Sequence, residues 1–271
     1  MHNRHIKILI KGRLFRYYCL LLCFCAIGGI LHAQQPQQGV SDEELKKAND
    51  PMAHTKAINL HHYILSSLYG LPHEAVSQTI LRYSQPAGNF LIRASMPFVV
   101  SSSPGKGPTT GFSDASLFAI YTFPSTSGNK FGIGPSITAP TGTHGLGAGK
   151  WQAGVSILAF LAKSRIIQMG SLLQWSASFA GSDNRPDVSL LTPQVFFIWQ
   201  LGAGFNLRST GVWSFNLENG DYNVPIGLGV GKVIKTGGVV FNIFCEPQFT
   251  VLAEGIGQPK FQTFIGFNTQ F

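Results

Sequence analysis

The sequence predicts an all-β protein, a transmembrane antiparallel β-barrel of about 12 strands with both termini on the periplasmic side. Three observations support this fold class. Apolar and polar residues alternate along most segments after residue 60, charged residues are scarce, and the links between segments alternate between long and short. Together these features indicate strands with one apolar and one polar face, closed on themselves within a membrane.

Residues 1–33 have the pattern of a secretory signal peptide. Five basic residues and no acidic residue precede an apolar run of 13 residues, CLLLCFCAIGGIL, which ends two positions before the small residue Ala33. A membrane anchor is disfavoured because a spanning helix requires ~20 residues. A lipoprotein is disfavoured because Cys23 and Cys25 lack a small residue before them. We therefore expect export to the outer membrane of a Gram-negative type cell.

Removal of this segment changes how the charge is interpreted. The formal net charge of +8 falls to +3 because five basic residues are lost, so we expect no nucleic-acid partner. Cys245 remains as a single cysteine, which excludes an internal disulfide. Residues 77–271 hold 19 charges in 195 positions, whereas soluble domains carry roughly 25% charged residues. No internal stretch is apolar for long enough to form a transmembrane helix.

Residues 34–55 differ from the rest of the chain because they are polar and contain the charged cluster SDEELKK. Ser41 and Glu44 have the spacing of a capping box, which predicts a short helix. We expect this region to be a mobile polar N-terminal extension outside the barrel. A plug or docking peptide is the alternative. Residues 56–271 then form the barrel domain.

Twelve β-segments, bounded by turn residues, follow one another from residue 60. They are 60–68, 77–85, 89–100, 112–123, 130–139, 150–161, 166–178, 190–200, 205–213, 223–235, 239–252 and 260–271. The odd-numbered links have 7 to 11 residues and the even-numbered links have 3 to 6. Outer-membrane barrels show this alternation because long loops face outward and short turns face the periplasm. An even number of strands places both termini in the periplasm.

The two faces of these segments predict which residues line the lumen. In 239–252, apolar residues such as Phe241 and Ile243 alternate with Asn242 and Glu246, so apolar side chains meet lipid and polar ones face inward. The same parity assigns four large rings to the inner face: Phe118, Phe196, Phe244 and Phe264. The charged residues predicted to line the lumen are Arg82, Arg93, Lys150, Arg208 and Glu246. The lumen should therefore be narrow and amphipathic.

The final strand, FQTFIGFNTQF, ends on an aromatic residue at the chain terminus. Phe261, Ile265, Phe267 and Phe271 share the lipid-facing side, while Gln262, Asn268 and Gln270 share the other. We expect this strand to pair with the first and close the ring. Phe271 resembles the assembly signal that the barrel assembly machinery recognises, so this machinery and outer-membrane lipids are the expected partners.

Two glycine-rich stretches, THGLGAGKW and PIGLGVGKV, do not fit a phosphate-binding loop. Such a loop needs a glycine five positions before its final glycine and Ser or Thr after the lysine, whereas Trp151 and Val233 follow the lysines here. The histidines show no metal-ligand spacing, and no Ser/His arrangement identifies a nucleophile and base. The sequence thus predicts no enzyme, catalytic residue, cofactor or metal site. An outer-membrane lipid hydrolase is the least favoured alternative.

Three stretches, in this order, carry a resemblance to a known family: FGIGPSITAPTGTHGLGAGKWQAGVSI, LLQWSASFAGSDNRPDVSLLTPQVFF and NVPIGLGVGKVIK. From about residue 77 to Phe271 the chain resembles a family of outer-membrane β-barrels described as transporters or linked to the meta-cleavage pathway of phenol degradation. The resemblance implies an outer-membrane barrel that passes small hydrophobic or aromatic molecules. It implies no particular functional residues.

We therefore expect a channel for passive uptake of small, partly hydrophobic solutes, including aromatic ones. Twelve strands lie between the ~8 that side chains can fill and the ~16–18 that leave a wide aqueous pore. The alternative is a structural or adaptor barrel with an occluded lumen that displays its long loops.

Overall fold

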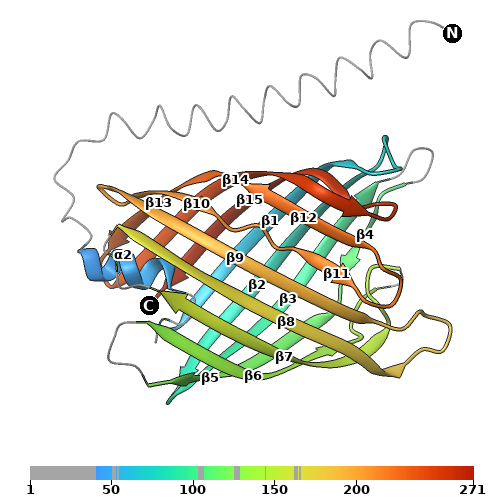
Figure 1. Cartoon of the computed structure of the whole chain (residues 1–271), viewed down its shortest axis with the longest axis horizontal. Coiled ribbons are helices and arrows are strands. Elements are labelled where there is room, and N and C mark those ends of the chain that lie inside the picture. The colour runs from blue at the N-terminus through green and yellow to red at the C-terminus, as the bar shows by residue number, and fades with distance from the viewer. Residues whose placement is uncertain are drawn as a thin grey trace, which may run out of the picture. The chain divides into compact units, whose positions relative to one another are not determined.

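The computed structural model describes residues 41–50, 53, 55–102, 107–124, 129–143, 145–161, 164 and 166–271. The predicted signal peptide lies outside these residues. The described chain forms one helix and a single antiparallel sheet that closes into a barrel (Figure 1). Among the described residues, no helix has the length and apolar character needed to cross a membrane.

The helix is α2 (Asp42–Asn49). The strand segments are β1 (Ala57–Leu68), β2 (Ala75–Ala87), β3 (Phe90–Ser102), β4 (Thr109–Phe112), β5 (Ala115–Phe123), β6 (Lys130–Ala139), β7 (Lys150–Leu161), β8 (Ile167–Gly181), β9 (Ser189–Gly202), β10 (Phe205–Ser209), β11 (Ser214–Asn216), β12 (Tyr222–Gly227), β13 (Gly229–Thr236), β14 (Val239–Glu254) and β15 (Pro259–Gln270).

These fifteen segments correspond to the twelve predicted strands, because three strands are interrupted. The segments β4 and β5 both pair with β3, β10 and β11 both pair with β9, and β12 and β13 both pair with β14. The ring closes where β15 pairs with both β14 and β1. The predicted closed barrel of 12 antiparallel strands is therefore confirmed.

The predicted boundaries agree well where a strand is regular. The segments 130–139 and 150–161 match β6 and β7 at both ends. Most other strand ends differ by one to three residues, and one larger difference arises where a side chain competes for the backbone. The N–H group of Thr210, just after β10, donates to the Glu246 carboxylate at 2.8 Å and leaves the ladder. Alternation in sequence cannot reveal this interruption, because it depends on a partner 36 residues away.

The outer and inner faces of the barrel follow the predicted parity. Large apolar side chains such as Phe131, Ile157, Ile243 and Phe267 are each about 40–47% exposed on the outside. By contrast, the four rings predicted to face inward, Phe118, Phe196, Phe244 and Phe264, are at most 7% exposed. This division matches a barrel whose outer surface contacts lipid and whose lumen is packed with side chains.

Helix α2 begins with the predicted capping box, in which Ser41 and Glu44 exchange side-chain to backbone hydrogen bonds. Residues 41–50 nevertheless pack against the barrel, contrary to the expectation that 34–55 lies outside it. Leu45 and Ala48 form a small buried cluster with Val233 of β13, against which Val240 packs. Figure 1 shows α2 at the end of the barrel where the C-terminus lies. The sequence did not predict that α2 packs on the barrel, because only two apolar residues of the helix, Leu45 and Ala48, form the buried contact.

Candidate functional site

One side of the lumen is filled by apolar side chains. The cluster consists of Leu91, Phe118, Ile120, Leu158, Phe160, Leu172 and Phe196, which come from β3, β5, β7, β8 and β9. Glycine makes this packing possible at one point, because a Cβ atom at Gly170 would lie 2.4 Å from Cζ of Phe196. Packing on the apolar side of the lumen thus requires glycine at position 170, because the ring of Phe196 occupies the space that a side chain there would need.

The opposite side of the lumen is polar and centres on Glu246, which is fully buried. Its carboxylate accepts hydrogen bonds from the Thr210 N–H at 2.8 Å, the Thr210 hydroxyl at 2.6 Å and Nε2 of Gln248 at 2.9 Å. Nε of Arg208 lies 3.8 Å from the same carboxylate. Because an uncompensated buried charge costs about 3–5 kcal/mol, these neighbours explain how the acid is tolerated.

Aromatic rings cover the space beside this network. Tyr63 stacks on Phe264 with 4.3 Å between the ring centroids, and Phe244 meets Phe264 edge-on at 4.9 Å. The guanidinium carbon of Arg208 lies 3.4 Å from the centroid of Phe244, which is a cation–π contact. A ring therefore replaces water on one face of this buried guanidinium.

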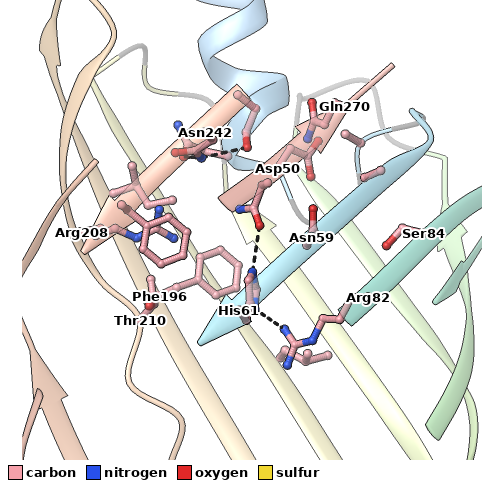
Figure 2. Close-up of a pocket in the computed structure, with 18 of the residues that line it drawn as sticks. Asp50, Asn59, His61, Arg82, Ser84, Phe196, Arg208, Thr210, Asn242 and Gln270 are labelled. Carbon is pink, nitrogen blue, oxygen red and sulfur yellow. Dashed lines mark hydrogen bonds between the residues drawn. The ribbon is translucent and has the colours of Figure 1, made fainter. Parts of the chain in front are cut away.

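His61 links the rings to a second arginine. Arg82 donates from Nη1 to Nδ1 of His61 at 3.0 Å, and Nε2 of His61 lies 2.8 Å from Oδ1 of Asn268. A guanidinium can donate but cannot accept, so Nδ1 is the acceptor and Nε2 carries the proton. His61 is therefore neutral in this arrangement and adds no charge to the lumen. Figure 2 shows the two hydrogen bonds of His61.

Between these two sides lies a half-open cavity of about 140 Å³. Its lining includes the guanidinium groups of Arg82, Arg93 and Arg208, the rings of Phe196, Phe244 and Phe264, and residues 48–50 at the end of α2 (Figure 2). Within the described part of the chain, six lining atoms are buried without a hydrogen-bond partner. They are Nε of Arg82, Nε and Nη1 of Arg208, Oγ1 of Thr55, Oδ1 of Asn59 and Oδ1 of Asn242.

Helix α2 lies in the mouth of the barrel next to this cavity. Glu44 pairs with Lys235 of β13, and Asn242 of β14 donates to the Ala48 carbonyl at 3.2 Å. At the other end, Asp50 forms an ion pair with Lys130 of β6. Strands β6 and β14 are six positions apart in a ring of twelve, so they are opposite each other. The helix itself lies against β13 to β15, because Gln270 also donates to the Lys47 carbonyl and Asn242 to Oδ1 of Asn49. The Asp50–Lys130 pair reaches across the mouth and narrows the lumen.

The structure brings three of the five predicted lumen residues, Arg82, Arg93 and Arg208, to one cavity, and Glu246 lies directly behind Arg208. Lys150 is buried elsewhere. It begins β7 at the end of the barrel away from α2, and its ammonium group lies 3.0 Å from the Asp187 carboxylate. Phe271 is 52% exposed, and its N–H donates to the Lys56 carbonyl at 3.0 Å, so the two ends of the barrel sheet are joined.

Sequence reasoning missed several residues of this cavity. His61 and Tyr63 lie on the inner face of β1, and their alternation with apolar neighbours was a usable signal. No sequence pattern indicated that Asn49 and Asp50 line the cavity, because their positions depend on how α2 docks against the barrel. Among the described residues, no group of three or more His, Cys, Asp or Glu side chains could hold a metal ion.

The glycine-rich stretch before β7 has a structural role at the far end of the barrel. The Asp114 carboxylate accepts hydrogen bonds from the Gly142 N–H at 2.9 Å and the Ala148 N–H at 2.6 Å. A Cβ atom at Gly147 would lie 2.2 Å from the Asp114 carboxylate. Arg185 donates to the carbonyls of Gly147 and Ala148. These residues therefore organise the loops at this end of the barrel.

Comparisons with known proteins find similarity in solved structures. The COG4313 outer membrane channel from Pseudomonas putida F1 aligns over 82% of this chain and 99% of its own, with a TM-score of 0.61 and 14% sequence identity. The KdgM porin aligns over 79% of this chain and 99% of its own, with a TM-score of 0.50 and 10% identity. No protein-family model and no curated protein sequence matches this chain. At these identities, the similarity extends to the fold.

Proposed function

We propose that the chain is an outer-membrane channel for passive uptake of small, partly hydrophobic solutes, including aromatic ones. The observation that carries this proposal is the lumen itself, where one cavity is lined by three guanidinium groups and three phenylalanine rings. Such a lining accommodates a solute with both a polar and an apolar part. The fold similarity to an outer membrane channel and to a porin supports the same function.

The proposed location is the outer membrane, with the α2 end of the barrel in the periplasm. The band of exposed apolar side chains supports a lipid-facing wall. The short links, such as those joining β2 to β3 and β13 to β14, lie at the end that holds α2. Outer-membrane barrels place short turns in the periplasm, which supports this orientation. Outer-membrane lipids and the barrel assembly machinery are its proposed partners.

A second candidate, a barrel with an occluded lumen that acts as an adaptor, is favoured by one observation. Helix α2 is held in the mouth against β13 by Glu44 with Lys235, and Asp50, which follows the helix, pairs with Lys130 on the opposite wall. We propose that this helix is displaced when solute passes, so that it acts as a gate on a channel. In an adaptor, the helix would instead be a permanent plug.

Planar-bilayer conductance and liposome swelling distinguish these functions. The purified chain should conduct above an empty bilayer, and a variant lacking residues 41–50 should conduct more. Swelling in a small aromatic solute should exceed swelling in an inert oligosaccharide too large to enter the lumen. If both proteins leave the membrane as tight as the empty control, the chain is not a channel and the adaptor hypothesis stands.

A further inference from the structure

We infer that the cavity between α2 and the arginines is a binding site for a small carboxylate attached to an apolar body about the size of one aromatic ring. This inference rests on the proposed channel function, because the lumen is the route by which a solute reaches the cavity. Figure 2 shows the arrangement, with Arg208 and Arg82 on two sides of the cavity and residues of α2 above it.

Arg208 is the principal reason to expect an anionic ligand. The residue is 7% exposed, and its Nε and Nη1 atoms have no hydrogen-bond partner among the described residues. Its position is set by Phe244, over which it lies, and by Glu246 behind it. A buried guanidinium with unused donors is suited to a carboxylate, because the two groups match in charge and in planar geometry.

The balance of charge around the cavity favours an anion over a cation. Arg82, Arg93 and Arg208 line the cavity, and Lys130 adjoins it through Asp50. The acidic groups here are Asp50, paired with Lys130, and Glu246, which accepts hydrogen bonds from Thr210 and Gln248. Four cations face two carboxylates, which leaves two positive charges in excess. A lumen with low-dielectric walls concentrates ions of the opposite sign.

The apolar part of the ligand follows from the remaining lining and from size. Phe196, Phe244, Phe264, Leu91 and Leu172 contribute apolar surface to the same cavity. Its volume of about 140 Å³ is close to that of an apolar cavity of roughly 150 Å³ known to hold benzene. A single ring with a carboxylate on its edge satisfies both parts of the lining, whereas acetate leaves the rings uncovered and a neutral ring leaves Arg208 unpaired.

Isothermal titration calorimetry of the full mature chain in detergent tests this site with three probes. Benzoate carries both the ring and the charge, benzamide has the ring without the charge, and acetate has the charge without the ring. Benzoate should bind roughly tenfold or more tightly than either of the others, since a charge-assisted hydrogen bond and the buried ring each contribute. Equal binding of the three probes, or none by benzoate, would overturn the inference.

Substitutions then test which residues hold the carboxylate. Arg208→Gln should weaken benzoate binding roughly 10- to 100-fold and leave benzamide nearly unchanged. Lys232→Gln is the matched control, because it removes one positive charge from the outer wall, where Lys232 lies over Phe205. If Arg208→Gln does not fold, Arg82→Gln serves in its place, since it removes another donor of the cavity without affecting the partner of Glu246.

Failure of this site and failure of the channel give different results. If the chain conducts but benzoate neither binds nor reduces its conductance, the site is wrong and the channel function stands. If benzoate binds with the expected dependence on Arg208 while no variant conducts, the site stands and the channel function is wrong. Unchanged benzoate affinity in both folded arginine variants counts against the assigned residues and the inference.

Discussion

Asp50, which follows the last turn of α2, pairs with Lys130, the first residue of β6, on the side of the barrel opposite the strands that hold the start of the helix. The Asp50 side chain is 6% exposed, so this contact is inside the mouth and not on its rim. A short helix is marginal in isolation, and its order here comes from contacts at both ends. This relationship makes the docking of α2 testable.

We first predict that weakening these contacts opens the lumen. Replacing Glu44 and Asp50 together by Gln and Asn should raise conductance, because this removes both ion pairs that hold the helix in the mouth. The fraction of channels with a displaced helix should then increase. Single-channel recording measures this as a larger open probability. Glu218→Gln is the control, as it removes an acid from the loop between β11 and β12, and a response equal to that of the double variant would contradict the prediction.

The second prediction concerns pH. The hydrogen bond from Lys235 lowers the pKa of Glu44 from its ordinary value of 4.5 to about 2. The stabilisation from this depressed pKa is fully present above pH 4.5 and is lost as the pH falls toward 2. Docking of α2 should therefore weaken in this window, and conductance should rise between pH 5 and pH 3. In the Glu44→Gln variant this rise should be smaller, and an unchanged rise would show that another group is responsible.

The third prediction is a loss of stability from overpacking. Gly170→Ala places a Cβ atom 2.4 Å from Phe196 and 2.5 Å from the Ala159 carbonyl. Because neither the strand nor the buried ring can easily move, the variant should lose about 1–3 kcal/mol. Denaturant unfolding of the barrel in lipid vesicles measures the change. Gly238→Ala is the control, since a Cβ atom there meets nothing within 4 Å, and equal losses at both positions would refute the packing argument.

The fourth prediction separates assembly from stability at the chain terminus. Deleting Phe271 should strongly reduce insertion by the barrel assembly machinery, because a terminal aromatic on the last strand is the proposed signal. It should change the unfolding free energy little, since the side chain is 52% exposed. Pulse-chase assembly in cells and unfolding of refolded protein measure the two effects. Phe179→Ala, at an exposed position near the end of β8, should leave assembly normal.

Much of the barrel could be predicted because strand geometry is local. Side chains alternate between faces with a period of two, so the sequence assigns Phe244 and Phe264 to the lumen and Ile243 and Phe267 to lipid. The structure places all four as predicted. The interruption after Ser209 was missed, because Glu246, which accepts the hydrogen bond of the Thr210 N–H group, is distant in sequence.

The sequence by itself determined the number of strands, their inner and outer faces and the position of the capped helix, because each depends on residues that are close together in the chain. Tertiary structure alone decided that α2 docks in the mouth, that Lys150 is remote from Arg208, and that Arg82, His61 and Phe244 share one cavity. The alternation of side chains along a strand places each one on the inner or the outer face. It gives neither the height of the side chain along the barrel axis nor its neighbour across the lumen. Those depend on strand tilt and register, which are set when the ring closes.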